Sequence, residues 1–148
     1  MASELETKSE AEILEHFKAG AKRYHLGEML LEPEIQKQGG DMVNAAIDAW
    51  DAKGPNGRET ALTPMLDDPD LHFRVEAAAA LIWVVPDRVI PILEDLYAHG
   101  PDEVSDAARV TLWVYRRDLQ EEQKARERQG GGVEGPDAGE AGAGEMGA

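Results

Sequence analysis

The chain has 148 residues, enough for one domain with a hydrophobic core and too few to make a second domain the first expectation. Its 30 acidic residues against 15 basic ones give a formal net charge of -15, which argues against a nucleic-acid partner because phosphate binding depends on clustered Lys and Arg. The sequence contains no cysteine, which excludes disulfides, thiolate chemistry and cysteine-ligated zinc.

The first helix is predicted from a capping box and an apolar stripe. Residues 1–8 have no periodic pattern and are expected to be flexible. Ser9 and Glu12 have the spacing at which each side chain bonds the other's backbone N–H at a helix start. Apolar residues then recur every three or four positions, which predicts an amphipathic helix ending before Pro33. They are Ile13, Phe17, Ala21 and Tyr24.

Two adjacent glycines interrupt the next helical pattern. Gly39 and Gly40 each weaken a helix by about 1 kcal/mol relative to alanine, so we expect a break there. Asp41 is then expected to cap a second helix that ends at Gly54, where the following proline prevents continuation. Its inward face is predicted to consist of Val43, Ala46, Ile47 and Trp50.

A helical-hairpin pattern occurs twice between Pro64 and Tyr115. Pro64 and Pro91 occupy equivalent positions 27 residues apart, and Trp83 and Trp113 lie 30 residues apart. Such offsets fit one stacked unit whose internal loop is longer in the second copy. Each proline is expected to bend the first helix of its copy, because it removes a backbone hydrogen bond.

The second helix of the first copy has a clear start signal. Asp68 is predicted as its N-cap, with Pro69 at the first helical position. The four alanines at 77–80 would let a neighbouring helix come close, and we place Ala79 in the tightest of these contacts. This helix is therefore expected to be the most enclosed in the fold.

The composition changes at Gly130, where Gly, Ala, Glu and Pro become dominant. Such a segment cannot bury enough apolar area to offset the entropy lost on ordering. We therefore expect a helical domain over 9–129 and a disordered acidic tail over 130–148. The helices are predicted near 9–30, 41–53, 57–67, 69–84, 87–99 and 101–125.

The duplicated hairpin resembles the HEAT repeat, a helical hairpin with a proline-bent first helix and an aspartate-led turn. The first copy carries that turn as Asp68-Pro69-Asp70 and continues with Arg74-Val75 and an alanine-rich second helix. In the second copy, Gly100-Pro101-Asp102 replaces the aspartate turn. The resemblance covers roughly 58–115.

Together with the preceding helices and the glycine-rich turn between them, the chain also looks like a small bacterial HEAT-like family of unknown function. That resemblance implies an all-α fold: a short HEAT-like α-solenoid of about three helical hairpins with a disordered C-terminal tail. It brings no catalytic residues with it.

No catalytic, cofactor or metal site is predicted. The four histidines, His16, His25, His72 and His99, do not show the spacing of a zinc-binding helix, so surface or capping roles are expected for them. His99, at a helix C-terminus, fits a cap that faces the helix dipole. Carboxylates are plentiful, but no motif pairs a nucleophile with a base and an orienting group.

Trp83 and Trp113 lie beside the predicted buried stripes, which leaves two interpretations. They could anchor a binding face, since Trp is enriched among interface hot spots. They could instead pack between adjacent hairpins, and we favour this because large aromatic side chains are highly buried on average.

We expect a soluble, cytoplasmic protein. No run of about 18 apolar residues is present, and the N-terminus lacks the basic-then-apolar order of a signal peptide. The acidic charge favours a basic protein partner, although a strong net charge also simply maintains solubility.

The function we expect is a non-catalytic protein-binding module, of the kind that immunity proteins represent when they neutralise a basic cognate toxin. The alternatives are a structural adaptor or a HEAT-like enzyme, such as a pigment lyase or a DNA glycosylase. The glycosylase needs a basic groove, whereas residues 56–115 carry eleven acids and four bases. The predicted partner-binding residues are Asp67, Asp70, Glu76, Asp87, Glu94, Asp95, Asp102, Glu103, Asp106, Trp83 and Trp113.

Overall fold

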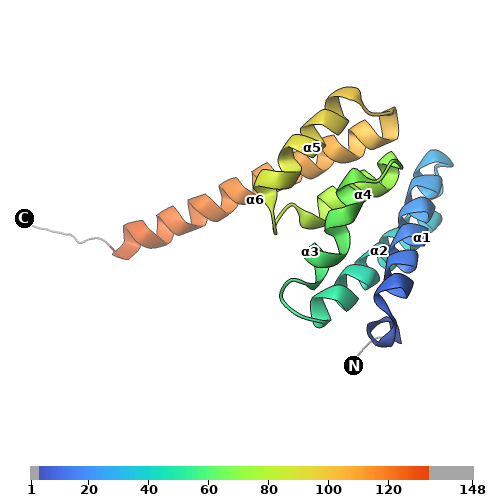
Figure 1. Cartoon of the computed structure of the whole chain (residues 1–148). Coiled ribbons are helices and arrows are strands. Elements are labelled where there is room, and N and C mark those ends of the chain that lie inside the picture. The colour runs from blue at the N-terminus through green and yellow to red at the C-terminus, as the bar shows by residue number, and fades with distance from the viewer. Residues whose placement is uncertain (1–3, 134–148) are drawn as a thin grey trace, which may run out of the picture. The chain divides into compact units, whose positions relative to one another are not determined.

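The computed structural model describes residues 4–133 and confirms the all-α class (Figure 1). Within that range the regular elements are six α-helices and two short 3₁₀ helices, named η, and there is no strand. In chain order they are η1 (Glu4–Thr7), α1 (Glu10–Met29), α2 (Pro33–Ala52), α3 (Gly57–Leu62), η2 (Thr63–Asp67), α4 (Leu71–Leu81), α5 (Pro86–His99) and α6 (Asp102–Val133).

The chain divides into two compact units, Met1–Leu112 and Trp113–Ala148. The boundary falls inside α6, and inside the range 9–129 that the sequence predicts as one helical domain. In the first unit, α1 and α2 form an antiparallel hairpin, and α4 contacts α1, α3 and α5 (Figure 1). This central position of α4 agrees with the prediction that it is the most enclosed helix.

The predicted start of α1 is confirmed. Ser9 Oγ accepts a hydrogen bond from the Glu12 backbone N–H at 3.2 Å, and a Glu12 carboxylate oxygen accepts one from the Ser9 N–H at 3.0 Å. The apolar stripe is buried at Ile13, Phe17 and Ala21, as expected. The capping box therefore gives a hydrogen-bond acceptor to two N–H groups at the helix start that have no partner within the helix.

Residues 4–7, expected to be flexible, form the 3₁₀ turn η1. The Lys53 ammonium donates hydrogen bonds to the carbonyl oxygens of Glu6 and Lys8, at 3.4 and 3.3 Å. The N-terminal turn is therefore tied to the end of α2. Residues 1–3 lie outside the described part of the chain.

The helices α1 and α2 touch backbone to backbone at Gly20, Gly27 and Gly39. A methyl group on Gly39 would overlap the Tyr24 backbone nitrogen, and one on Gly27 would overlap the backbone of Gln36. The predicted helix break at Gly39-Gly40 is therefore wrong. The missing side chain at Gly39 is needed for close packing, and this tertiary contact outweighs the low helix propensity of glycine.

Since α2 is not interrupted, it begins at Pro33, which occupies the favoured first helical position. The predicted cap at Asp41 is also wrong, because Asp41 lies in the middle of α2 and pairs with Lys37 at 3.0 Å. The inward face is close to the predicted one: Val43, Ala46 and Trp50 are buried.

The first of the two predicted proline-bent helices, which contains Pro64, differs from expectation. The predicted helix over 57–67 is divided, because α3 ends at Leu62 and the 3₁₀ helix η2 carries Pro64 in its first turn. Pro91, its sequence equivalent, remains inside α5. The two copies of the pattern therefore accommodate their prolines in different ways.

The start of α4 lies two residues beyond the predicted one. Asp70, not Asp68, is the N-cap, and its Oδ1 accepts a hydrogen bond from the His72 N–H at 2.9 Å. Asp68 Oδ1 instead accepts one from the Asp70 N–H at 2.8 Å, and the Arg74 guanidinium donates to the Asp68 carbonyl at 2.9 and 3.1 Å. Both aspartates therefore order the turn. Asp70 takes the N-cap role predicted for Asp68, and Asp68 holds the backbone of Asp70 in place.

The alanine run of α4 is buried on a different face from the predicted one. Ala77 and Ala78 are fully buried, whereas Ala79 is half-buried and lines a cleft. The prediction that Ala79 occupies the tightest helix contact is therefore wrong, and the helical phase in this run is displaced by one residue.

The last two helices follow their predicted stripes. Val89, Leu93 and Leu96 of α5 are buried, as are Val104 and Ala108 in the first turns of α6. The helix α6 continues to Val133, so the first four residues of the predicted tail are helical, and 134–148 lie outside the described residues. None of the described helices combines the length and the hydropathy needed to span a bilayer.

The contact between α1 and α2 gives a first test. We expect Gly39→Ala to lower the free energy of unfolding by about 1 to 3 kcal/mol, because its methyl group meets backbone that cannot move aside. Gly40→Ala is the matched control: its added Cβ would lie 3.8 Å from Tyr24 Cδ2, an ordinary contact. This second variant should gain up to about 1 kcal/mol from helix propensity. Urea denaturation followed by circular dichroism would measure both, and equal effects would contradict the backbone contact.

Candidate functional site

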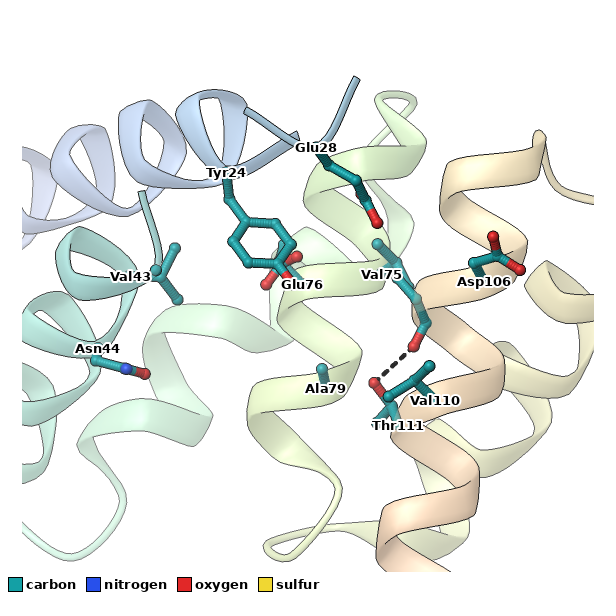
Figure 2. A pocket seen from close by; sticks show the side chains of 12 residues that line it. Tyr24, Glu28, Val43, Asn44, Val75, Glu76, Ala79, Asp106, Val110 and Thr111 are labelled. Carbon is teal, nitrogen blue, oxygen red and sulfur yellow. Dashed lines mark hydrogen bonds between the residues drawn. The ribbon is translucent and has the colours of Figure 1, made fainter. Parts of the chain in front are cut away.

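A cleft of about 330 Å³ opens between α2, α4 and the first turns of α6. Figure 2 shows that side chains from all three helices line it, with Tyr24 and Glu28 of α1 at one end. Its apolar lining comes from Val43, Val75, Ala79 and Val110. All of these residues belong to the first compact unit, so the cleft is complete within it.

The cleft continues into a second hollow of about 530 Å³ along α2 and α4. The two hollows share Val43, Asn44, Glu76 and Ala79, and the second one extends to Trp83. Together they form one continuous groove, and four carboxylates lie along it. We call it the acidic groove and define it by Glu28, Asp48, Glu76, Asp106 and Trp83.

The charge of the acidic groove is compensated only in part. Arg58 is the one basic side chain among the residues that line either hollow. Its guanidinium forms a bidentate pair with Asp51, at 2.5 and 3.1 Å, and donates a third hydrogen bond to the Ala80 carbonyl at 2.9 Å. These bonds engage Arg58 with groups other than the four groove carboxylates. His25 and Arg109 do not line either hollow, but His25 contacts Glu28 and Glu76, and Arg109 lies 3.8 Å from Asp106. Four carboxylates beside two such cations leave the groove with a negative potential.

The predicted acidic residues separate into three places. Glu76 and Asp106 lie in the acidic groove. Asp70 and Glu103 flank His72, in a separate cluster described below. The remaining ones are exposed and line neither place: Asp67, Asp87, Glu94, Asp95 and Asp102.

The tryptophans do not pack as the favoured interpretation requires. Trp83 is 51% exposed at one end of the acidic groove, which agrees with the alternative of an accessible anchor. Trp113 opens the second unit and is exposed, with the Arg117 guanidinium over its ring at 4.9 Å. The buried tryptophan is Trp50, whose ring is tilted against Phe17 at 5.6 Å.

Several groove residues were absent from the predicted site, among them Glu28, Asn44 and Asp48. Gly40, Asn44 and Asp48 follow one another at four-residue spacing and therefore share a face of α2. That spacing is visible in the sequence, and Asn44 and Asp48 both lie within the helix predicted over 41–53. The sequence does not show that α4 borders this face, so these residues were not included in the site.

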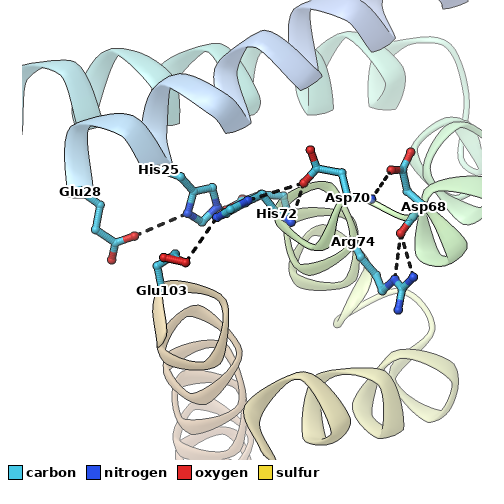
Figure 3. A network of polar contacts seen from close by, with 8 residues as sticks. His25, Glu28, Asp68, Asp70, His72, Arg74 and Glu103 are labelled. Carbon is cyan, nitrogen blue, oxygen red and sulfur yellow. Dashed lines mark hydrogen bonds and ion pairs between the residues drawn. The ribbon is translucent and has the colours of Figure 1, made fainter. Parts of the chain in front are cut away.

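A second polar site surrounds His25, which was expected at the surface but is only 5% exposed. Its Nε2 lies 3.1 Å from a carboxylate oxygen of Glu76, and its Nδ1 lies 3.5 Å from one of Glu28. The His72 ring is 4.4 Å away between centroids and stands near Asp70 and Glu103, at 3.6 and 3.9 Å (Figure 3). Two histidines are thus enclosed by four carboxylates.

The carboxylates around His25 favour its charged form. Burial is the largest single influence and by itself lowers the pKa of this imidazole. The hydrogen bond and the negative charge of Glu76, with a further contribution from Glu28, outweigh it and raise the pKa above its ordinary value of 6.5. The protonated ring can then donate from both nitrogens, which connects α1 to α4.

Neither site has the geometry of a metal centre. Within residues 4–133, no three His, Asp or Glu side chains converge in a way that could hold a metal ion. His99, predicted as a helix cap, lies in the last turn of α5 with its Nδ1 3.2 Å from Asp95 Oδ1.

No protein-family model, curated protein or solved structure matches this chain. The resemblance to HEAT repeats and to the small bacterial HEAT-like family therefore stays a prediction.

The raised pKa of His25 predicts how stability depends on pH. Because the folded-state pKa exceeds the unfolded one, the stabilisation is fully present below about 6.5 and is lost as pH rises through the folded-state value. The free energy of unfolding should therefore fall across that window, by about 1.4 kcal/mol for each unit by which the pKa is raised. Denaturation at a series of pH values would measure this.

His25→Gln is the matched variant for that experiment, because it keeps a polar side chain but removes the titration. It should be less stable than the parent at low pH and should lack this part of the pH dependence. A parent and a variant with parallel pH profiles would contradict the assignment to His25.

Proposed function

We propose that this protein is a non-catalytic binding module whose acidic groove takes up a basic segment of a partner protein. The observation that carries the proposal is the lining of the groove, where four carboxylates surround an apolar floor and Arg58 is engaged elsewhere. Such a groove complements positive charge, and a partner that supplies it would be steered toward the groove by long-range attraction.

The floor of the groove indicates which basic side chains fit. Val110 is 48% exposed and offers apolar surface beside the half-buried Ala79, whereas Val43 and Val75 are buried in the lining. Lys and Arg have long apolar stems that can lie on such a surface while their charged ends reach carboxylates. Glu76 and Asp106 are within the same cleft as that apolar floor.

Trp83 gives the groove a second kind of contact. Its indole is half exposed beside the groove, and aromatic rings of this type are enriched among the residues that dominate interface energetics. An Arg of the partner could also stack on the ring face, which adds attraction to the ring quadrupole.

The class of protein that we propose is an immunity-type binder that neutralises a basic toxin by covering part of its surface. The proposal includes the finer architecture, a short HEAT-like α-solenoid of three hairpins, and action in the cytoplasm. The antiparallel α1–α2 hairpin and the contact of α4 with α5 support it, because successive hairpins of a solenoid present their edges along one extended binding surface.

The proposal is tested by reversing charge in the groove and measuring association with a labelled lysine-rich peptide in stopped flow. Asp48→Lys with Asp106→Lys should slow association by about tenfold at low salt, since the attraction that steers the peptide is removed. Both residues are exposed, so folding should be unaffected. Added salt should slow association to the parent protein as well.

The matched control is Asp87→Lys with Asp95→Lys, which makes the same charge change on exposed positions of α5 outside the groove. It should slow association far less. If both pairs slow it equally, the peptide responds only to net charge, and the acidic residues serve solubility rather than a site.

Ala79→Leu tests the same site without changing any charge. Its larger side chain would fill the floor of both hollows, so affinity for the peptide should fall by about tenfold while circular dichroism stays helical. Unchanged affinity would mean that the peptide does not enter the groove.

A further inference from the structure

The turn between α1 and α2 exposes four large apolar side chains, which we call the hydrophobic tip: Leu26, Met29, Leu30 and Leu31. Met29 is 71% exposed and Leu31 is 87% exposed. Single exposed apolar residues are normal on protein surfaces, but a cluster within six consecutive positions is a common mark of an interaction site.

The backbone makes this exposure more costly. Leu31 has φ of 57°, and it is the one non-glycine residue with positive φ in the described part of the chain. The Glu32 N–H bonds the Gly27 carbonyl at 2.8 Å, and the Leu31 N–H bonds the Glu28 carbonyl at 3.2 Å. These two bonds define a Schellman turn, in which the position of Leu31 is usually glycine because a Cβ is unfavourable there.

Leucine at this position therefore opposes folding through backbone strain, and its exposed side chain gains almost no burial that would offset this strain. Glycine or asparagine would suit the turn better and would leave less apolar surface in water. The side chain of Leu31 gains little contact within the described chain, because most of its surface is open. A contact with another molecule would give it the burial that the free protein lacks.

A cavity of about 510 Å³ adjoins the hydrophobic tip and includes Leu26 and Met29 in its lining. Asp70 and Glu103 are also in its lining, beside His72. Lys22 and His25 are in the lining as well. An apolar edge thus stands next to a pair of carboxylates, separate from the acidic groove.

Charge decides which occupant fits. A second copy of a chain with a net charge of -15 would be repelled, and Glu28, Glu32 and Glu34 lie close in sequence to the tip. The same charges oppose an anionic membrane surface. A partner that supplies apolar side chains together with cations satisfies both the tip and the carboxylates.

We propose that the hydrophobic tip and its adjoining cavity dock a basic amphipathic helix of a partner protein. The apolar stripe of that helix covers Leu26, Met29 and Leu31, and a Lys or Arg one turn away pairs with Asp70 and Glu103. The sign of the partner's charge rests on the proposed function, but this is a second site with a different chemistry, since its affinity depends on apolar burial.

The test uses a synthetic helical peptide of Leu and Lys with its leucines on one face, and the full chain. Isothermal titration calorimetry should show binding, and Leu31→Gly should weaken it by about tenfold. The same variant should melt at an equal or higher temperature, because glycine suits the positive φ. Met29→Ser is a second tip variant that does not touch the strained position.

The matched control is Tyr97→Ser, which removes a comparably exposed large side chain from α5, outside the tip. Its affinity for the Leu–Lys peptide should equal that of the parent. Nuclear magnetic resonance shifts on peptide addition should be largest for α1 residues near the tip and for residues around His72.

Four outcomes would overturn the inference. One is no binding of the Leu–Lys peptide, and another is binding that both tip variants leave unchanged. A third is tip-dependent binding of zwitterionic lipid vesicles in place of the peptide, and the fourth is a tip-dependent dimer in sedimentation. If only the groove reversals weaken binding of the Leu–Lys peptide, the proposal for the hydrophobic tip is wrong and the groove proposal stands.

If the groove variants do not change association of the lysine-rich peptide, the groove proposal alone is wrong.

Discussion

The close contact between the backbones of α1 and α2 is the constraint on which the rest of the first unit depends. It brings Gly20 and Gly27 of one helix against the other with no side chain between them at those points. Tyr24 and Glu28 of α1 are thereby held beside Asn44 of α2, at one end of the acidic groove. A hairpin spaced by ordinary side chains would move these groups apart by the thickness of a methyl group or more.

The histidine cluster complements that contact by connecting the same hairpin to α4. His25 lies in α1, two residues before Gly27, and its ring contacts the carboxylate of Glu76. Glu76 also lines the acidic groove. Glu76 therefore serves both the internal ion pair and the candidate binding surface. Its side chain is 17% exposed, so most of it is committed to the interior and only part faces a ligand.

Much of the fold could be predicted from local sequence, because the controlling interactions are local. The capping box at Ser9 and the stripes of α1, α5 and α6 depend on residues a few positions apart. The N-cap of α4 was predicted two residues too early because Asp68 and Asp70 both suit an N-cap, and only the hydrogen bonds distinguish them. The cores of these helices follow from periodicity even where their ends do not.

The site was harder to predict because it depends on tertiary contacts. The partner of His25 is 51 residues away, and nothing in its own segment indicates burial. Propensity assigns Gly39 to a break, whereas packing against α1 needs it inside a helix. Of the predicted acidic residues, Glu76 and Asp106 came together in the groove because α4 and α6 both border it.

The glycine contact also limits how related sequences can diverge. A side chain cannot be added at Gly27 or Gly39 without separating two backbones, whereas the exposed groove residues Asp48 and Asp106 can change without disturbing the buried contacts of His25. Evolution would therefore preserve a sparse glycine pattern, with Gly20 and Gly27 two helical turns apart in α1 and Gly39 of α2 against Gly20, while overall identity decays. Distant relatives with different partners would share this spacing and little else, and a search on the spacing would find them where a search on overall similarity does not.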